Sequence, residues 1–299
     1  MRKFIITGIS ILLLQTSFAC DICGCSSGNY FVGPFPWFHK HFVGVRYTFR
    51  TFHSVVKDDV TEFSRDFYQT TEVWGGWNIG KRWQLLTFLP YNINRQESDE
   101  GVMKSSAFGD ATIIANYNVL SKKTTSKSGN GVSQQLWIGA GVKLPTGKFS
   151  ADEEDFIPSA NNQAGTGSID LLLNTMYSIR INQWGVSSNI NYKINRDAHN
   201  YQFGNRFSAS AFVFRSLATP KVTFNPNTGL LYESIQANKL GGLKVNDTGG
   251  RALFAAAGME TTFNKIAIGL NAQLPVDQHL SNGQTTARLR GMLHVTYAF

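Results

Sequence analysis

The chain has 299 residues, enough for one large all-β unit or two ordinary domains. Charged residues make up 16% of it, below the ~25% usual for soluble domains, while Gly, Phe, Tyr and Trp are abundant, as in β-barrels. The net charge of +8 does not indicate nucleic-acid binding, because Lys and Arg are scattered instead of forming one stripe. It fits a surface facing lipopolysaccharide or a path for anions, and solvated surface charge is the simpler interpretation.

Residues 1–19 have the parts of a secretory signal peptide. Arg2 and Lys3 precede an apolar run over 9–14, and Ser17 and Ala19 place small residues before a cleavage site. The run is too short to span a membrane, and no later stretch reaches the ~20 consecutive apolar residues that a spanning helix needs. We therefore expect an exported protein, and any membrane crossing must be made by strands.

Residues 20–41 form a segment rich in cysteine and then in Gly, Pro and aromatic residues, which we expect to plug or rim the barrel mouth. It holds every cysteine of the chain, Cys20, Cys23 and Cys25. In an oxidising compartment, a local disulfide with one cysteine left over is the commonest outcome. A copper or zinc site completed by His39 and His41 is the sharper alternative. Lipid attachment at Cys20 is a third, disfavoured because the preceding S-F-A lacks the usual Leu.

From Phe42 onward, apolar and polar residues alternate, which is the pattern of a strand with one face on lipid and the other in a barrel lumen. The alternation is clearest from Trp184 to Ile194, whereas Pro226 indicates a bulge or a change of register. The pattern predicts about twelve strands, each near the ~9–11 residues of a tilted membrane strand. They cover 42–50, 72–79, 83–92, 111–119, 135–144, 170–180, 184–194, 205–215, 222–233, 251–261, 266–274 and 289–299.

The expected connections alternate between short and long, as periplasmic turns and extracellular loops do in outer-membrane barrels. Links near Gly80, 181–183, 216–220 and Asn264 are short. One link, 120–133, is long on the nominally periplasmic side. An even strand number places both termini in the periplasm. The long polar links are 53–65, 93–109, 145–168, 195–204, 234–249 and 275–286.

The last strand ends in Phe299, with Tyr297 two residues before it, and resembles the closing strand that outer-membrane barrels present to their assembly machinery. Taken alone, it also fits an edge strand of a soluble sandwich. The alternation of faces, the alternation of loops and this terminal strand agree on one fold. We expect an all-β protein in which residues 42–299 form a single antiparallel transmembrane β-barrel in the outer membrane.

Known catalytic patterns are missing from the sequence. The stretch from Gly141 to Gly147 differs from a phosphate loop in its spacing, and Lys148 is followed by Phe. The acidic run Asp152 to Asp155 lacks the ligand spacing of a calcium loop and is better interpreted as a solvated loop face. Neither G-x-S-x-G nor H-E-x-x-H occurs, so no enzyme activity and no resident cofactor are expected.

Three motifs, L-P-Y-N at 89–92, F-G-D-A-T at 108–112 and G-A-G-V-K-L-P-T-G at 139–147, resemble the meta-pathway phenol-degradation family of outer-membrane barrels. The resemblance extends in layout over 40–299, and the family is distantly similar to the fatty-acid channel barrels. It implies passage of small hydrophobic or aromatic compounds across the outer membrane. The cysteine cluster is outside that pattern and favours an alternative, a metal-binding or redox-linked protein with the barrel as anchor.

We therefore expect a channel or transporter whose sites lie on the lumen face, with outer-membrane lipid, lipopolysaccharide, the assembly machinery and a small solute as partners. Apolar residues on that face favour a hydrophobic solute, or pack against Phe31, Phe35, Trp37 and Phe38 of the N-terminal segment. They are Trp74, Leu86, Phe88, Trp137, Leu172 and Met176. The ionisable candidates serve conduction or pair across the lumen to hold the barrel closed. They are Arg46, Arg50, Glu72, Lys143, Asp170, Arg180, Arg251, Glu260, Arg288, Arg290 and His294.

Overall fold

The computed structural model describes residues 40–56, 59–99, 101–125, 131–150 and 160–299. The expected signal peptide, the three cysteines and His39 lie outside the described residues. Within them, no helix is long and apolar enough to span a membrane.

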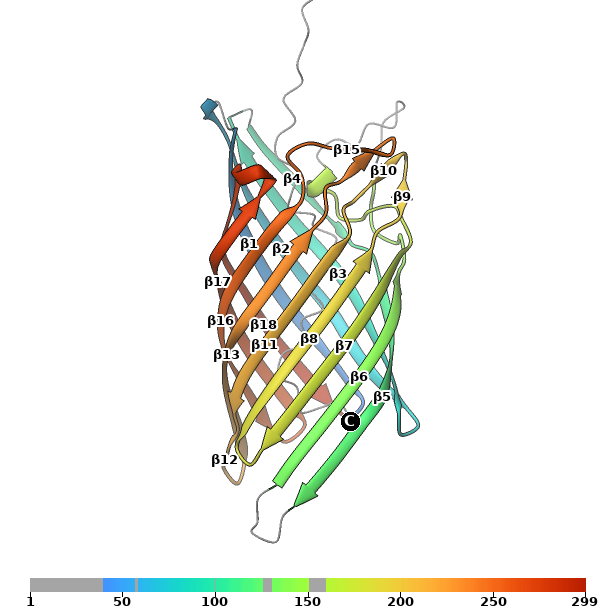
Figure 1. The fold of residues 1–299 in the computed structure, drawn as a ribbon, viewed down its shortest axis with the longest axis vertical. Coiled ribbons are helices and arrows are strands. Elements are labelled where there is room, and N and C mark those ends of the chain that lie inside the picture. Colours follow the sequence, from blue (N-terminus) through green and yellow to red (C-terminus); the bar gives the residue numbers. More distant parts are fainter. Residues whose placement is uncertain (1–39, 57–58, 100, 126–130, 151–159) are drawn as a thin grey trace, which may run out of the picture.

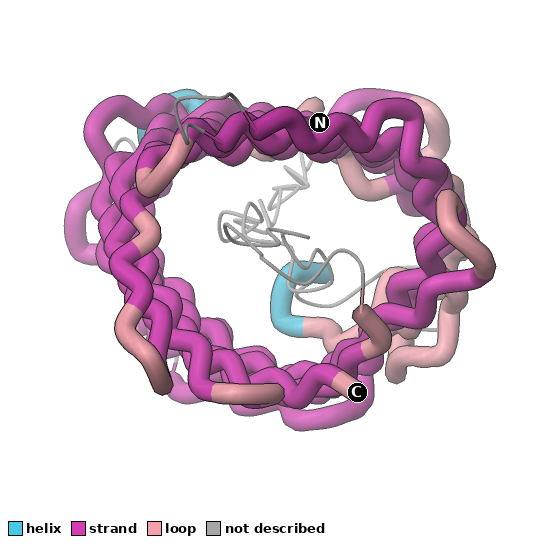
Figure 2. Tube along the Cα trace, turned by 90° about the horizontal axis from the view of Figure 1, so that it is seen from below, coloured by secondary structure: helices cyan, strands magenta, loops and turns pink. Residues whose placement is uncertain are grey.

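Twelve antiparallel strands form a closed barrel, as the sequence predicts. Each wall strand pairs with the wall strands that precede and follow it in the sequence. The ring is completed where the first, β1, pairs with the last, β18. Figure 1 shows the tilted strands from the side, and Figure 2 shows the closed ring from one end. The strands of the wall are β1 (Phe42–Val56), β2 (Asp59–Ile79), β3 (Trp83–Ser98), β5 (Thr112–Thr125), β6 (Gly131–Lys143), β7 (Asp170–Ile181), β8 (Trp184–Ile194), β11 (Arg206–Arg215), β13 (Val222–Ile235), β16 (Gly250–Phe263), β17 (Ile266–Leu280) and β18 (Thr285–Ala298).

The two ends of the barrel differ. At the short-turn end, which holds Ala298 and the turns at 80–82, 182–183 and 264–265, the connections are tight. At the long-loop end, the links carry a small separate sheet, labelled in part at the top of Figure 1. The remaining elements are β4 (Gly101–Phe108), β9 (Asp197–Ala198), β10 (Tyr201–Gln202), β12 (Leu217–Ala218), β14 (Lys239–Leu240), β15 (Leu243–Lys244) and the short helices η1 (Ala160–Asn162) and η2 (Ser281–Gly283).

Alternate residues of each strand face lipid and lumen. On β17, Ile268 and Leu270 are exposed on the outer face, whereas Ala267 and Asn271 are buried on the inner one. Outer positions of a membrane barrel contact hydrocarbon, so their exposure in the isolated chain indicates the lipid-facing surface. The faces predicted from the alternation are confirmed for most strands.

Exposed aromatic residues gather at the short-turn end. The guanidinium of Arg82 lies 6.0 Å from the ring of Tyr117, and that of Arg215 lies 5.4 Å from the ring of Trp184. The ammonium of Lys265 is 5.8 Å from the ring of Tyr297. Such rings with a polar partner suit the boundary between hydrocarbon and headgroups, so they indicate one edge of the membrane-spanning band.

Several expected loops are strands instead. The link 93–109 is a hairpin made by the end of β3 and by β4, and β1, β2 and β17 also extend beyond their predicted ends. Polar residues there do not interrupt pairing, because a hairpin beyond the bilayer needs no apolar face. Pro226 leaves the register between β13 and β16 unbroken, and it lies where the pairing of β13 passes from β11 to β12.

The lipid-facing assignment predicts the effect of a charge on the outer face. Leu270→Arg, near the middle of β17, is expected to destabilise the barrel by about 2–4 kcal/mol, because the guanidinium would enter the hydrocarbon core. Phe263→Arg at the end of β16 should cost only about 0–1 kcal/mol. Urea unfolding in lipid vesicles would measure both. Equal losses would contradict the assignment.

Candidate functional site: the barrel lumen

Aromatic and aliphatic side chains fill the lumen toward the short-turn end. Trp74 is 1% exposed and lies at a ring distance of 6.2 Å from Phe88 in a stacked arrangement and 4.9 Å from Phe42 edge-on. All six apolar lumen residues that the sequence predicts are in this one cluster. We call it the lower cluster, and it consists of Phe42, Trp74, Leu86, Phe88, Ile114, Trp137, Leu172, Met176, Ala267 and Ala298.

A second apolar group lies nearer the long-loop end, here called the upper cluster. It consists of Phe52, Tyr68, Leu231, Ala252, Phe254, Leu280 and Ala287. Because these side chains are buried, the lumen is packed rather than an open aqueous pore. A twelve-strand barrel is only modestly wider than the eight-strand barrels that side chains nearly fill, so this packing is physically reasonable.

Two Arg–Glu ion pairs and one hydrogen-bonded His–Glu pair form a belt between the two clusters. Arg46 bonds to Glu72, Arg290 to Glu233 at 2.8 Å, and His294 to Glu260 at 2.9 Å. The His294 pair reaches across the intervening strand β17 at Gly269, where a Cβ atom would lie 2.1 Å from both partners. Buried charges need partners of this kind. Arg46 and Glu72 pair across the neighbouring strands β1 and β2, whereas the Arg290–Glu233 and His294–Glu260 pairs link β18 to strands that are not its neighbours in the sheet.

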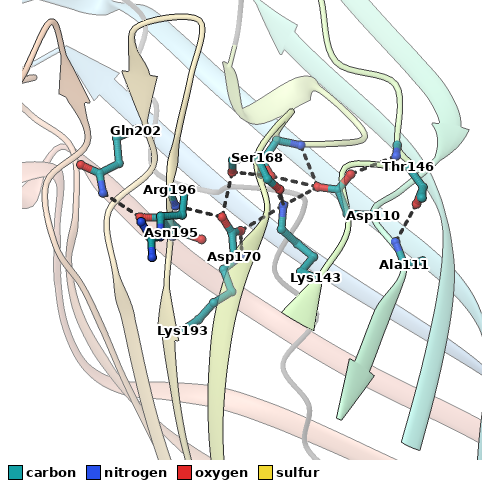
Figure 3. A network of polar contacts seen from close by, with 12 residues as sticks. Asp110, Ala111, Lys143, Thr146, Ser168, Asp170, Lys193, Asn195, Arg196 and Gln202 are labelled. Carbon is teal, nitrogen blue, oxygen red and sulfur yellow. Dashed lines mark hydrogen bonds and ion pairs between the residues drawn. The ribbon is translucent and has the colours of Figure 1, made fainter. Parts of the chain in front are cut away.

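A fourth charged group lies where the wall strand next to β3 is interrupted. β4 ends at Phe108 and β5 begins at Thr112, and Asp110 lies in the gap. Its carboxylate accepts bonds from Lys143 Nζ at 2.6 Å, from the Thr166 backbone N–H at 2.9 Å and from the Gly147 backbone N–H at 2.9 Å. Figure 3 shows these contacts converging on the carboxylate.

Lys143 connects this carboxylate to a second one. Its ammonium is also 3.0 Å from Asp170, which Lys193 approaches to 3.5 Å. Lys143 and Asp170 are both 0% exposed, so the two lysines and two aspartates form a charge-balanced network in a dry site. We call Asp110, Lys143, Asp170 and Lys193 the loop anchor.

The loop anchor holds the described parts of the link after β6, residues 144–150 and 160–169, against the inside of the wall. On the same link, the carbonyl oxygens of Asn162 and Ala164 accept bonds from Asn94 at 3.2 Å and Asn92 at 2.9 Å. Both asparagines face inward from β3. The short helix η1 therefore lies inside the ring, as the end view in Figure 2 shows, and it narrows the lumen near the long-loop end.

A family model, that of the MetA-pathway of phenol degradation, matches residues 49–290. The chain belongs to this family. The motifs F-G-D-A-T and G-V-K-L-P-T-G contain Asp110 and Lys143, so two of the stretches that carried the resemblance build the loop anchor. In this member of the phenol-degradation family, Gly109 and Gly147 lie against one another beside Asp110, which leaves no room for larger side chains.

Solved structures show the same fold. An outer membrane channel from Pseudomonas putida F1 is similar with a TM-score of 0.60 and 14% identity over 91% of this chain and 99% of that one. The β-domain of the Bordetella autotransporter BrkA is similar with a TM-score of 0.51 and 11% identity, over 87% and 100%. No curated protein matches by sequence. The recognition of an outer-membrane barrel of this family is thus confirmed.

Most of the predicted ionisable residues do lie in the lumen. Those buried there are Arg46, Glu72, Lys143, Asp170, Glu260, Arg290 and His294, and Arg50 is partly buried. Sequence analysis missed Asp110, Lys193 and Glu233 as members of these pairs. Asp110 stands in a quoted motif, which was the available signal, whereas Glu233 is in a strand with unclear alternation.

Three predicted lumen residues were placed wrongly. Arg251 is exposed on the outer face, because Ala252 and Phe254 are the inward residues of β16. Arg288 is exposed because a bulge puts two residues of β18, Arg288 and Leu289, opposite Thr51 alone, which shifts the alternation by one. Arg180 has the inward parity but is exposed at the rim of the short-turn end.

The proposed metal ligands are not tested by the structure. Cys20, Cys23, Cys25 and His39 lie outside the described residues. His41 Nδ1 faces the backbone N–H of Asn78 at 3.2 Å, and its ring stacks on Phe299 at 5.8 Å. Within the described part of the chain, no group of three or more His, Cys, Asp or Glu could hold a metal.

The loop anchor predicts a large loss of stability on removal of one charge. Asp110→Ala should lower the free energy of unfolding by about 3–5 kcal/mol, because it leaves the Lys143 ammonium buried beside fewer acceptors. Asp197→Ala, an exposed carboxylate on the small outer sheet, should change it by less than about 0.5 kcal/mol. Urea unfolding followed by gel mobility of unheated samples would measure both. Similar losses in the two variants would show that Asp110 has no special role.

Proposed function

We propose that this barrel is an outer-membrane channel that passes small hydrophobic or aromatic molecules without an enzymatic step. The observation that carries the proposal is the lower cluster, in which Trp74, Phe88 and Trp137 line the inside of a membrane barrel. An aqueous porin has a polar, water-filled interior, and buried rings there would obstruct its flow. For an apolar solute the same rings provide contacts at little desolvation cost.

The packed lumen supports a gated route rather than an open one. Apolar side chains and the described parts of the inward link, residues 144–150 and 160–169, line and narrow the path along the barrel axis. A solute must displace these side chains as it moves, and apolar contacts exchange readily for one another, whereas a sugar or ion would lose its hydration. Selection would thus follow from packing, with the ion pairs keeping the wall closed.

The lengths of the connections support one orientation of the barrel in the outer membrane. We place the short-turn end and both termini in the periplasm, because short turns face that side in barrels of this type. Phe299, with its ring exposed beside Tyr297, then presents an aromatic terminus to the assembly machinery. Membrane phospholipid and lipopolysaccharide cover the outer face. The support is the strand pattern, the even strand number and the aromatic edge.

Replacement of a lumen tryptophan tests the function. Trp74→Ala should lower accumulation of a radiolabelled aromatic hydrocarbon by about three- to ten-fold, the effect of one lost aromatic contact. Accumulation is measured in cells of a deletion strain that carry each variant, because lipopolysaccharide slows passage through the bilayer itself. The matched control is Trp77→Ala, which removes an outward ring that is 39% exposed and should leave accumulation unchanged.

The same cells test the alternative that uses the N-terminal cysteines. If aromatic accumulation matches that of wild type in the deletion strain while copper or iron sensitivity changes, the channel proposal fails. The metal content of the purified protein is then measured with and without Cys20, Cys23 and Cys25. Stoichiometric copper, zinc or iron that is lost with the cysteines would favour the metal-binding alternative.

A further inference from the structure

The charged belt of the lumen has a cavity on one side. The space between its walls is about 580 Å³ when open solvent is included, and about 50 Å³ of it admits the centre of a water molecule. Its walls come from β1, β2, β17 and β18, four consecutive strands around the closure of the barrel. Polar and apolar groups both line it, and the residues are Arg46, Thr48, Phe49, Arg50, Thr70, Glu72, Gln273, Arg290, Gly291 and Met292.

Among the described residues that line this cavity, arginines outnumber acids. Three guanidinium groups, those of Arg46, Arg50 and Arg290, line it, against the single carboxylate of Glu72. Glu72 is itself bound by Arg46, and the other nearby acid, Glu233, is bound by Arg290. A low-dielectric wall strengthens this excess, so the cavity attracts an anion and repels a cation.

Arg290 is prepared to hold such an anion. Its guanidinium carbon lies 3.9 Å from the ring centroid of Phe254 and 5.4 Å from that of Phe52, so the planar group is fixed beside two rings. The side chain is 6% exposed, and its Nε atom is buried without a hydrogen-bond partner. A fixed guanidinium with a spare donor suits a carboxylate, which accepts hydrogen bonds from such a fork.

The cavity lies between the two apolar groups of the lumen. Along β1, Phe42 belongs to the lower cluster, Arg46 and Arg50 line the cavity, and Phe52 belongs to the upper cluster. The guanidinium carbon of Arg46 lies 5.2 Å from the ring centroid of Trp74. A solute with an apolar body and one anionic group therefore meets complementary surfaces at adjacent positions of the lumen.

We propose that the cavity lined by Arg46, Arg50 and Arg290 binds the carboxylate of an amphiphilic solute whose aromatic or aliphatic body lies on the neighbouring apolar cluster. This inference rests on the proposed function and deepens it, because it names the class of solute that the channel selects. A purely neutral hydrocarbon would leave the cavity unused. An ammonium-bearing amphiphile would face three guanidinium groups.

The test compares a carboxylate with a neutral molecule of the same shape. Equilibrium dialysis of the purified mature protein in detergent, at neutral pH, would use radiolabelled benzoate and benzamide. The folded state of each sample is checked by the mobility of unheated protein. We expect benzoate to bind about ten-fold more tightly than benzamide, the effect of one charge-assisted contact.

Arg50→Gln locates the site, since Arg50 is the least buried of the three arginines and its loss threatens the fold least. The variant should remove most of the preference for benzoate, and Arg50→Lys should keep part of it. Arg251→Gln is the matched control, the same substitution on the outer face, and should keep the full preference.

Equal affinity for benzoate and benzamide in the wild type, or a preference unchanged in Arg50→Gln, would overturn the inference. If accumulation of aromatic hydrocarbons still depends on Trp74, the proposed function survives that result. If accumulation does not depend on Trp74 either, both the inference and the proposed function are contradicted. A preference for benzoate that depends on Arg50 would support the inference by itself.

Discussion

Closure of the sheet is the constraint on which the other features depend. A bilayer offers no water to backbone amides, so a spanning strand must find partners on both sides, and the pairing of β1 with β18 removes the last free edges of the wall. Once the ring is closed, each side chain has only two directions available. The period of two along each strand then decides which residues meet lipid and which meet the lumen, and the chemistry of the channel follows from that division.

The lumen contains both apolar surface and buried charged groups, which are usually kept apart. Apolar clusters at two depths line the path of the proposed hydrophobic solute, while buried ion pairs link strands such as β18 and β13 across the interior. Each Arg–Glu pair is neutral overall, so neither leaves an unpaired charge buried in the wall. The loop anchor applies the same chemistry at the long-loop end, where Asp110 holds Gly147 and Thr166 of the following link in the interior. In the proposed channel, these features leave a narrow path in place of an open pore.

The alternation of residues was sufficient to predict the number of strands, their order and most of the lumen residues, because one face of each strand must be apolar along its whole length in lipid. It failed where that demand is absent. The hairpin of β3 and β4 extends past the bilayer, and the bulge at Arg288 shifts the period without any change in composition. The partners of the buried charges were also beyond the sequence pattern: Glu233 and Arg290 lie 57 positions apart, and only the curvature of the closed wall brings them together. Arg251 was assigned to the lumen because its side chain is charged, although the strict alternation along β16 places it on the same outer face as Leu253.

The central claim is that the interior of this barrel holds apolar solutes at the lower cluster. Crystals of the protein soaked in a brominated aromatic hydrocarbon would test it directly, because bromine gives an anomalous signal at its position. The account predicts a peak inside the barrel beside Trp74 and Trp137. Peaks confined to the lipid-facing surface, with an unoccupied lumen in the same crystals, would contradict it.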